Sequence, residues 1–256
     1  MRTVLLDGDV YLFQAASAAQ RECDWGDGVW STHSSLPDAT DKLREDVYVV
    51  KEYLGADSVV VALSDPSGWY FRHDIFPDYK SKRRNTRKPL LYGALRRWCE
   101  EQFHTLTKPG LEADDVLGVM ATRNTGPEWG EKIIVSPDKD MGTIPGLWTI
   151  GAGSPAVRIS EETAFLLHMS QTLTGDTVDN YPGCPGVGPV KANRILNGTK
   201  DRSDEGMWRA VVETYEKAGL TEEHALVQAR LARILQSSDY NYDKEEPILW
   251  TAPTTK

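Results

Sequence analysis

The chain has 256 residues, a hydrophobic content of 40% and a formal net charge of -9, which is typical of a globular protein with a sizeable core. Its apolar runs are shorter than the roughly 20 residues that span a bilayer, and the apolar N-terminal stretch is too short for a signal peptide, so no membrane association is expected. Three cysteines without metal-like spacing favour a reducing, cytoplasmic setting.

The first 150 residues alternate between predicted strands and predicted helices. Short apolar or β-branched runs predict strands at residues 3–6, 58–63, 104–107 and 132–135. Apolar residues at helical spacing predict helices at residues 43–54, 89–103 and 114–122. This alternation predicts an α/β fold with a parallel sheet and helices on both faces. Residues 24–35, rich in Gly, Trp and Ser, are predicted to form a loop.

Beyond residue 151 the pattern becomes helical. Ser160 is a predicted N-cap, because Glu161 and Glu162 follow it in what would be the first turn. Further helices are predicted at residues 189–197, 205–218 and 222–235. We therefore expect two parts, residues 1–155 and 156–256, packed against each other.

Acidic residues follow each predicted strand: Asp7, Asp65, Glu112, Asp114, Asp115, Asp138 and Asp140. In an open parallel sheet, ligands bind outside the carboxyl ends of the strands, so these carboxylates are expected to converge on one edge. A single Asp after a strand is more often a helix cap or a turn residue, and we interpret Asp9 in that way. Four acidic sites at successive strand ends favour a functional cluster over a structural role.

Residues 175–192, GDTVDNYPGCPGVGPVKA, combine acidic and glycine-rich features. Asp176 and Asp179 are three apart, so a helix or tight turn would direct both carboxylates to one side. Behind them comes a glycine turn that opens a helix. Glycines let a ligand approach the backbone, and a helix N-terminus offers free N–H groups to a phosphate. The residues expected to bind phosphate here are Gly186, Val187, Gly188 and Lys191.

The nine carboxylates expected at one edge cannot all remain ionised without cations, because mutual repulsion would raise several of their pKa values. Oxygen ligands suit Mg²⁺ or Mn²⁺, and two ions about 3.5–4 Å apart are the usual arrangement for attack on a phosphodiester. The net charge is then a poor guide to nucleic-acid binding. A local basic run at residues 79–88, YKSKRRNTRK, supports a nucleic-acid partner.

The ordered series DGD, SD, EADD, SPDKD and GDTVDNYPGCPGVGPVKA resembles the flap endonuclease and 5′–3′ exonuclease family over nearly the whole chain, and the tail resembles free-standing phage exonucleases. The resemblance implies a PIN-like α/β nuclease domain in residues 1–155, with a basic arch at about residues 77–88. It also implies a helix–two-turn–helix DNA-binding motif in residues 156–256. The first implied metal cluster consists mainly of Asp7, Asp65, Glu112, Asp114, Asp115 and Asp138. Asp140, Asp176 and Asp179 extend this set of acids to a second metal cluster.

The resemblance also assigns roles to the basic run. Lys80 and Arg83 fall where the family has a catalytic lysine and arginine that contact the scissile phosphate. Tyr79 is expected to stack on a base. Other phosphate contacts are expected from Lys82, Arg84, Arg87 and Lys88. Related proteins hold K⁺ in the glycine turn through backbone carbonyls, and we carry that over as an expectation.

The expected function is a monomeric, structure-specific 5′ nuclease that uses two Mg²⁺ or Mn²⁺ ions. Its partner would be double-stranded DNA with a 5′ end or flap, or an RNA–DNA hybrid, in the host cytoplasm if a phage encodes it. One alternative is a haloacid-dehalogenase-like phosphatase, because residues 4–10, VLLDGDV, contain an Asp-x-Asp after a strand. The other is a DNA-binding relative without catalytic activity.

Overall fold

A computed structural model describes residues 1–82, 86–124 and 130–253. A six-stranded sheet lies at its centre in the order β5-β4-β1-β6-β7-β8. The strands are β1 (Arg2–Asp7), β4 (Ser58–Ala62), β5 (Thr105–Leu106), β6 (Glu131–Val135), β7 (Gly146–Thr149) and β8 (Val157–Ile159). Neighbouring strands are parallel except for β7 and β8, which pair antiparallel. The predicted parallel sheet is confirmed.

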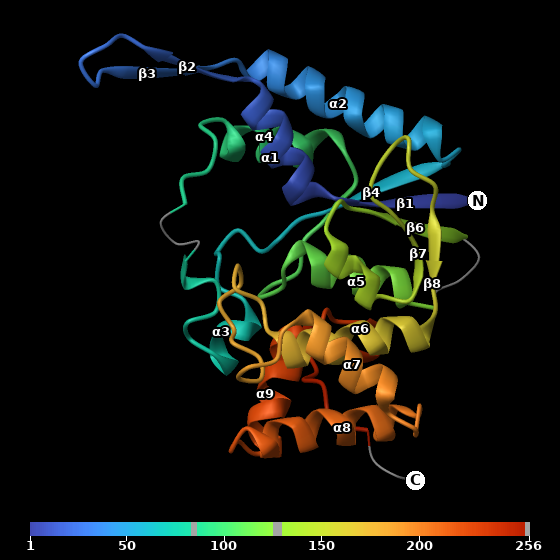
Figure 1. Cartoon of the computed structure of the whole chain (residues 1–256). Helices are drawn as coiled ribbons and strands as arrows, with labels where there is room; N and C mark the ends of the chain where they lie inside the picture. The colour runs from blue at the N-terminus through green and yellow to red at the C-terminus, as the bar shows by residue number, and fades with distance from the viewer. Residues whose placement is uncertain (83–85, 125–129, 254–256) are drawn as a thin grey trace.

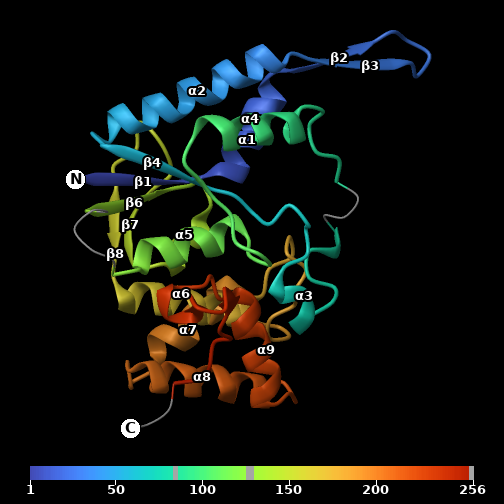
Figure 2. The same ribbon diagram turned by 180° about the vertical axis from the view of Figure 1, so that it is seen from behind.

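Helices cover both faces of the sheet, as Figures 1 and 2 show. One face carries α1 (Gly8–Ala18), α2 (Leu36–Tyr53) and α4 (Tyr92–Gln102), and the other carries α5 (Ala113–Thr122). Successive side chains of β1 point to opposite faces, so Val4 and Leu6 join the first core and Leu5 joins the second. All three residues are buried, which explains why β1 has an unbroken apolar sequence.

A helical region lies beside the α5 face of the sheet (Figure 1). It consists of α6 (Glu161–Thr174), α7 (Pro189–Gly198), α8 (Asp204–Lys217) and α9 (Glu222–Ala232). Ser160 caps α6 as predicted, and its hydroxyl accepts a hydrogen bond from the Thr163 amide at 3.1 Å. The region has its own apolar core, in which Met169, Trp208 and Tyr215 are buried.

The C-terminal segment, residues 233–253, connects the two parts. Leu235 packs in the core under α5, so closely that a Cβ on Gly118 would lie 2.2 Å from the Leu235 carbonyl oxygen. Trp250 returns to the helical region and makes edge contacts with His168 and Trp208. Residues 156–256 therefore contribute to the core under the sheet as well as to the helical core. The sheet itself continues past residue 155, because its strand β8 begins at Val157.

The prediction of a loop at residues 24–35 was wrong. Most of it belongs to a hairpin of β2 (Gln20–Asp24) and β3 (Trp30–Ser34), which projects from the molecule beyond α2 (Figure 1). Its tryptophans, Trp25 and Trp30, remain 69% and 60% exposed, so no apolar core dictated this hairpin. A second short hairpin pairs β9 (Tyr240–Asn241) with β10 (Glu246–Pro247). In the described part of the chain, no helix has the length and apolar character needed to cross a membrane.

His168 on α6 provides a test of the helical core. It is fully buried, and its Nε2 lies 2.8 Å from the Ala229 carbonyl oxygen. Burial lowers the pKa of His168 to about 3, whereas the unfolded chain takes up this proton near pH 6.5. Its contribution to stability is therefore complete above pH 6.5 and is lost as the pH falls towards 3.

Between pH 7 and pH 5, His168 should lower the free energy of unfolding by about 2 kcal/mol. Urea unfolding in Mg²⁺ should show this loss in the wild-type chain, and it should be absent from His168→Gln. His33→Gln, at an exposed position, is the matched control and should show the same pH dependence of the free energy of unfolding as the wild-type chain. The same loss of unfolding free energy between pH 7 and pH 5 in all three proteins would contradict the assignment of this loss to His168.

Candidate nuclease site

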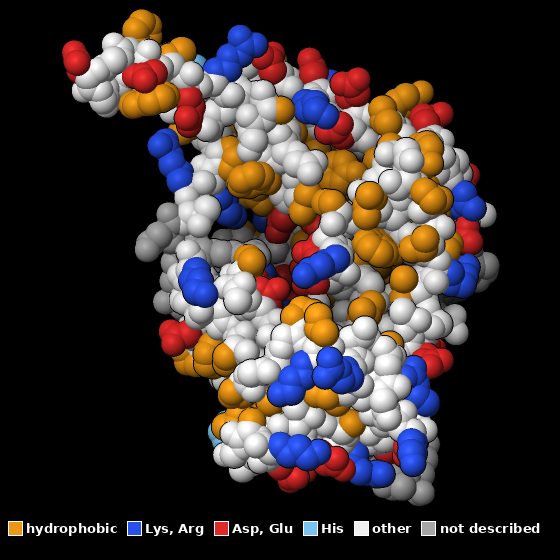
Figure 3. Space-filling view, viewed as in Figure 1, with side chains coloured by type: hydrophobic (Ala, Val, Ile, Leu, Met, Phe, Trp, Pro, Cys, Tyr) orange, Lys and Arg blue, Asp and Glu red, His pale blue; other side chains and the backbone are white. Residues whose placement is uncertain are grey.

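Acidic side chains from distant segments surround one cavity at the carboxyl edge of the sheet. The cavity has a volume of about 230 Å³. Its acidic lining residues are Glu112, Asp114, Asp138, Asp140, Asp176 and Asp179. Glu112 is the N-cap residue of α5, Asp138 and Asp140 follow β6, and the last two lie in the loop after α6. Figure 3 shows carboxylates in a hollow between the sheet layer and the helical region.

Three further acids were expected at this site, and the structure places them differently. Asp7 ends β1 and is buried behind the lining, where its Oδ2 accepts a hydrogen bond from the Ser136 hydroxyl at 2.7 Å. Asp65 turns away, because its carboxylate accepts hydrogen bonds from the amides of Ser67 (2.9 Å) and Gly110 (2.6 Å). Asp115 is fully buried and faces Arg72. The expected convergence of Asp65 and Asp115 on the cavity is therefore not observed.

Several of these carboxyl groups repel one another in a poorly hydrated environment. Burial, together with the charges of Asp9 and Asp138, raises the pKa of Asp7 to about 6. Burial, Asp138 and the 176–179 loop raise the pKa of Asp140 to about 6. Burial and Asp7 raise the pKa of Asp114 well above its usual value. Asp138 contributes to each of these shifts, so it lies close enough to Asp7, Asp114 and Asp140 for its charge to act on all three.

Glu112 has the opposite environment. Burial alone would raise its pKa, but Lys80 and Arg72 outweigh burial and lower the pKa of Glu112 to about 2. The Lys80 ammonium contacts the Glu112 carboxylate and lies 3.6 Å from Asp179 Oδ2. The Tyr79 hydroxyl donates to Glu112 at 2.9 Å and lies 3.0 Å from Asp179 Oδ2. Glu112 therefore remains ionised and holds the expected catalytic lysine at the cavity.

Two glycines shape the loop that carries Asp176 and Asp179. Gly175 has φ 65° and packs against Gly183, where a Cβ on Gly175 would lie 2.5 Å from the Gly183 nitrogen. Only glycine accommodates both the positive φ and this approach. The loop is also fixed to the start of the basic run, because the Lys80 amide donates to the Asp179 carbonyl oxygen at 2.8 Å. Lys80 itself has φ 52°, a conformation rare outside glycine.

The basic run differs in part from expectation. The proposed stacking of Tyr79 on a base is wrong, because its side chain is 2% exposed and its hydroxyl engages two carboxylates. Lys82 is exposed and donates to the Thr177 carbonyl oxygen at 3.0 Å. Arg87 and Lys88 are exposed, and Lys88 lies over the Tyr92 ring. Arg83 and Arg84 lie outside the described residues.

The glycine turn lies on the surface of the helical region. Gly186 and Gly188 are exposed, while the Val187 side chain is buried in the core. Gly188 is the N-cap of α7 and Pro189 opens it, so no side chain covers the first amides of the helix. The exposed Lys191 lies nearby, with its Nζ 3.3 Å from the Gly186 carbonyl oxygen. A phosphate could therefore reach this turn without any rearrangement of the fold.

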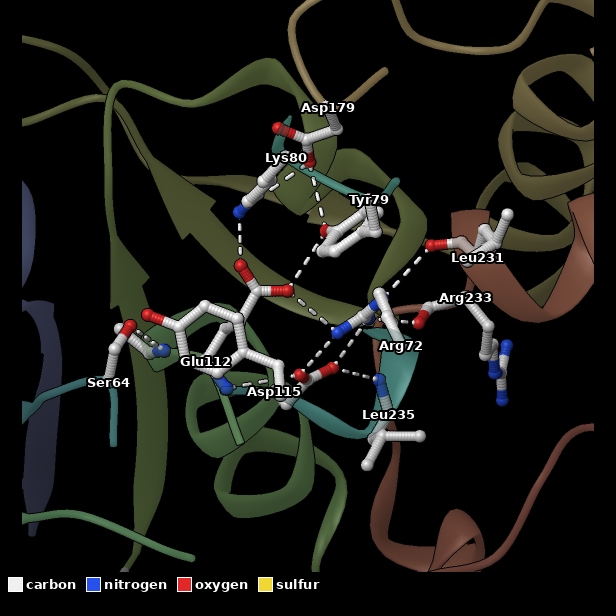
Figure 4. A network of polar contacts seen from close by, with 12 residues as sticks. Ser64, Arg72, Tyr79, Lys80, Glu112, Asp115, Asp179, Leu231, Arg233 and Leu235 are labelled. Atoms are coloured by element: carbon white, nitrogen blue, oxygen red, sulfur yellow. Dashed lines mark hydrogen bonds and ion pairs between the residues drawn. The ribbon is translucent and has the colours of Figure 1, made fainter. Parts of the chain in front are cut away.

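Sequence reasoning missed Arg72. This residue lies in α3 (Phe71–Ile75), is 3% exposed, and forms ion pairs with both Glu112 and Asp115 (Figure 4). Its signal was an arginine within the apolar and aromatic sequence WYFRHDIF, residues 69–76. An arginine buried among aromatic side chains needs a buried carboxylate partner, and the EADD sequence offers several.

The chemistry of the cavity fits divalent metal ions. Its carboxylate oxygens are the ligands preferred by Mg²⁺ and Mn²⁺, and burial, together with neighbouring carboxylates, raises the pKa values of Asp7 and Asp140, which a bound cation would offset. Within the described ranges, no three His, Cys, Asp or Glu side chains are close enough to hold one ion. The fit therefore rests on the donor chemistry and the shared cavity.

Residues 2–146 match a family model described as 5′-3′ exonuclease, N-terminal resolvase-like domain. The exodeoxyribonuclease of Enterobacteria phage T3 is 31% identical, with 97% of this chain and 92% of the relative covered. The flap endonuclease Xni of Vibrio campbellii is 30% identical, with 86% and 92% covered. The T5 D15 protein, crystallised with metal ions, has a similar fold, with a TM-score of 0.65, 15% identity, and coverage of 91% and 89%. The chain belongs to the 5′–3′ exonuclease family and is a nuclease.

Proposed function

We propose that this nuclease is a structure-specific, two-metal-ion enzyme that hydrolyses phosphodiesters near a 5′ end or flap and leaves a 5′-phosphate and a 3′-hydroxyl. One observation carries the proposal: six carboxylates and Lys80 line a single cavity at the edge of the sheet. Relatives named exodeoxyribonuclease and flap endonuclease support both the 5′ exonuclease and the flap-cleaving activity. Family membership also argues against the phosphatase alternative.

One Mg²⁺ or Mn²⁺ ion would be held mainly by Asp7, Glu112 and Asp114, and a second by Asp140, Asp176 and Asp179. Asp138, whose charge acts on members of both sets, would contribute to both positions. Bound divalent ions would supply Lewis-acid chemistry, which activates the attacking water and offsets charge on the phosphate. The T5 5′-exonuclease has been solved with bound divalent zinc ions, which supports metal binding by this fold.

Lys80 and Arg83 would contact the scissile phosphate. The position of the Lys80 ammonium beside Glu112 and Asp179 supports its part in this pair. Glu112, Asp179 and Tyr79 would orient the lysine, since Tyr79 is buried with its hydroxyl between the two carboxylates. The five histidines take no part in this proposal.

The helical region would bind duplex DNA away from the cut. The exposed turn at residues 186–188 and Lys191 would contact the phosphate backbone, with K⁺ held by turn carbonyls, and such contacts position a duplex without specifying sequence. Further contacts would come from Lys82, Arg84, Arg87 and Lys88. The T5 D15 flap endonuclease has been solved with DNA and metal ions. We extend the proposal to a monomer that acts in the host cytoplasm and accepts RNA–DNA hybrids.

Digestion of 5′-labelled substrates tests this function. We expect Mg²⁺-dependent release of short 5′-labelled products from flap, blunt and RNA–DNA hybrid duplexes, with the cut near the junction on flaps. The same duplexes labelled at the 3′ end should lose the label slowly, and EDTA should stop the reaction. Binding to these duplexes without cleavage in Mg²⁺ or Mn²⁺ would favour the DNA-binding alternative instead.

A further inference from the structure

The guanidinium of Arg72 lies buried where three parts of the chain meet (Figure 4). Nη1 donates to Glu112 at 2.9 Å and to Asp115 at 2.7 Å, and Nη2 donates to Asp115 at 2.8 Å. The remaining bonds go to the end of α9, from Nε to the Leu231 carbonyl oxygen (3.0 Å) and from Nη2 to that of Arg233 (2.5 Å). A guanidinium has five N–H donors, and this arrangement uses all of them.

The hydrogen-bonding capacity of the Asp115 carboxylate is also fully used. Besides its two bonds from Arg72, its Oδ1 accepts from the Leu235 amide at 3.1 Å and its Oδ2 accepts from the Glu112 amide at 3.3 Å. A carboxylate offers about four lone-pair sites, so the protein already occupies all of them. The side chain is fully buried, and it does not line the acidic cavity.

The adjacent Asp114 differs in each of these respects. It lines the cavity and is only partly buried. It lies near enough to Asp7 and Asp138 for their charges to act on it. One turn of α5 thus directs two neighbouring carboxylates to different tasks, Asp114 towards the cavity and Asp115 towards Arg72.

We propose that Arg72 is a positioning residue of the nuclease site and that Asp115 is its buried anchor rather than a metal ligand. Arg72 fixes the Glu112 carboxylate from the side opposite Lys80, and it ties the end of α9 to α5. Leu231 and Ala232 line the cavity, so this tie also fixes one of its walls. Only the effect of Arg72 on catalysis rests on the proposed function; the anchor role of Asp115 does not.

Asp115→Asn and Asp114→Asn in the full chain form a matched pair. The thermal midpoint in EDTA should fall by roughly 10 °C for Asp115→Asn, because breaking a buried ion pair leaves Arg72 uncompensated. When Mg²⁺ is added without DNA, the midpoint of Asp115→Asn should rise by as much as that of the wild-type chain. Asp114→Asn should keep or raise its midpoint in EDTA, because it removes a carboxyl group with a raised pKa, and it should lose at least half of the Mg²⁺-dependent increase. A loss of that increase in Asp115→Asn comparable to the loss in Asp114→Asn would overturn the anchor role.

Turnover tests Arg72 separately. The double variant Arg72→Met with Asp115→Leu replaces the buried ion pair by apolar groups and should recover most of the thermal midpoint. Its kcat should remain at least tenfold below wild type with KM within about twofold, because Glu112 keeps Lys80 and Tyr79 but loses Arg72. The more conservative Arg72→Lys should fold and show the same kcat loss, since lysine lacks the fixed two-pronged geometry.

Recovery of kcat along with stability in the double variant, or wild-type kcat in Arg72→Lys, would reduce Arg72 to a purely structural residue. Failure of the proposed function has a different signature, because the wild-type chain itself would then show no Mg²⁺-dependent cleavage. The midpoint measurements do not depend on cleavage, so they decide the role of Asp115 in either case.

Discussion

Asp138→Asn is expected to lower the single-turnover rate of 5′ cleavage on the order of a thousandfold. Asp138 lines the cavity with Asp114 and Asp140, and its charge acts on both of them and on Asp7. Loss of its charge should weaken both proposed metal positions together, and several kcal/mol of transition-state stabilisation correspond to this rate effect. Rapid mixing of pre-bound enzyme and flap DNA with Mg²⁺ measures the rate.

The substitution should leave the local fold intact. Asp138 Oδ1 accepts the Asp140 amide at 2.9 Å, and the carbonyl oxygen of asparagine can accept the same bond. Affinity for DNA should stay within about threefold of wild type, because the proposed binding contacts are made by basic side chains and backbone groups and not by Asp138. Asp243→Asn, at an exposed position, is the matched control and should cleave normally. A rate loss explained entirely by weaker DNA binding would contradict a metal-holding role for Asp138.

Sequence periodicity and strand-end acids predicted the sheet and most of the cavity. Strands such as β1 and β4 are buried on both faces, so their apolar runs specify them. Convergence of Glu112, Asp138 and Asp140 then follows from parallel topology alone. Asp176 and Asp179 join them from the helical region, and it was the specific motif around them that indicated this.

What the sequence could not predict depends on side-chain direction. Asp65 and Asp138 both follow strands, but Asp65 turns back to accept the Gly110 amide, which lies 45 residues further along the chain. Asp114 and Asp115 are neighbours with different partners, and the partner of Asp115 comes from α3. Tyr79 was assigned to DNA because it adjoins basic residues, whereas tertiary packing buries it. Pattern analysis places a residue at an edge, and long-range hydrogen bonds decide where it points.

Mg²⁺ should raise the thermal midpoint, and by more at pH 8 than at pH 5. Asp7 and Asp140 have pKa values of about 6 in the folded chain, above their ordinary value of 3.8. Protonation of these two groups therefore stabilises the folded chain. In the absence of metal, this stabilisation is complete below about pH 4 and is lost as the pH rises through about 6. The whole loss is on the order of 3 kcal/mol for Asp7, of which about half falls between pH 5 and pH 8, and it is smaller for the less buried Asp140. Ions that bind only the folded state should remove this penalty.

The expected difference in Mg²⁺-dependent midpoint increase between pH 8 and pH 5 is roughly 4–8 °C, from about 2 kcal/mol for the two groups together and a few degrees per kcal/mol in a chain of this size. Differential scanning fluorimetry at both pH values, with NaCl at matched ionic strength as the control, measures it. His168 destabilises the chain at pH 5 with and without metal, so its effect cancels in this difference. Glu112, with a pKa of about 2, stays ionised in the folded chain at both pH values and therefore adds nothing to the difference between them. An equal Mg²⁺ effect at both pH values would mean that repulsion among these carboxylates is not what the ion relieves.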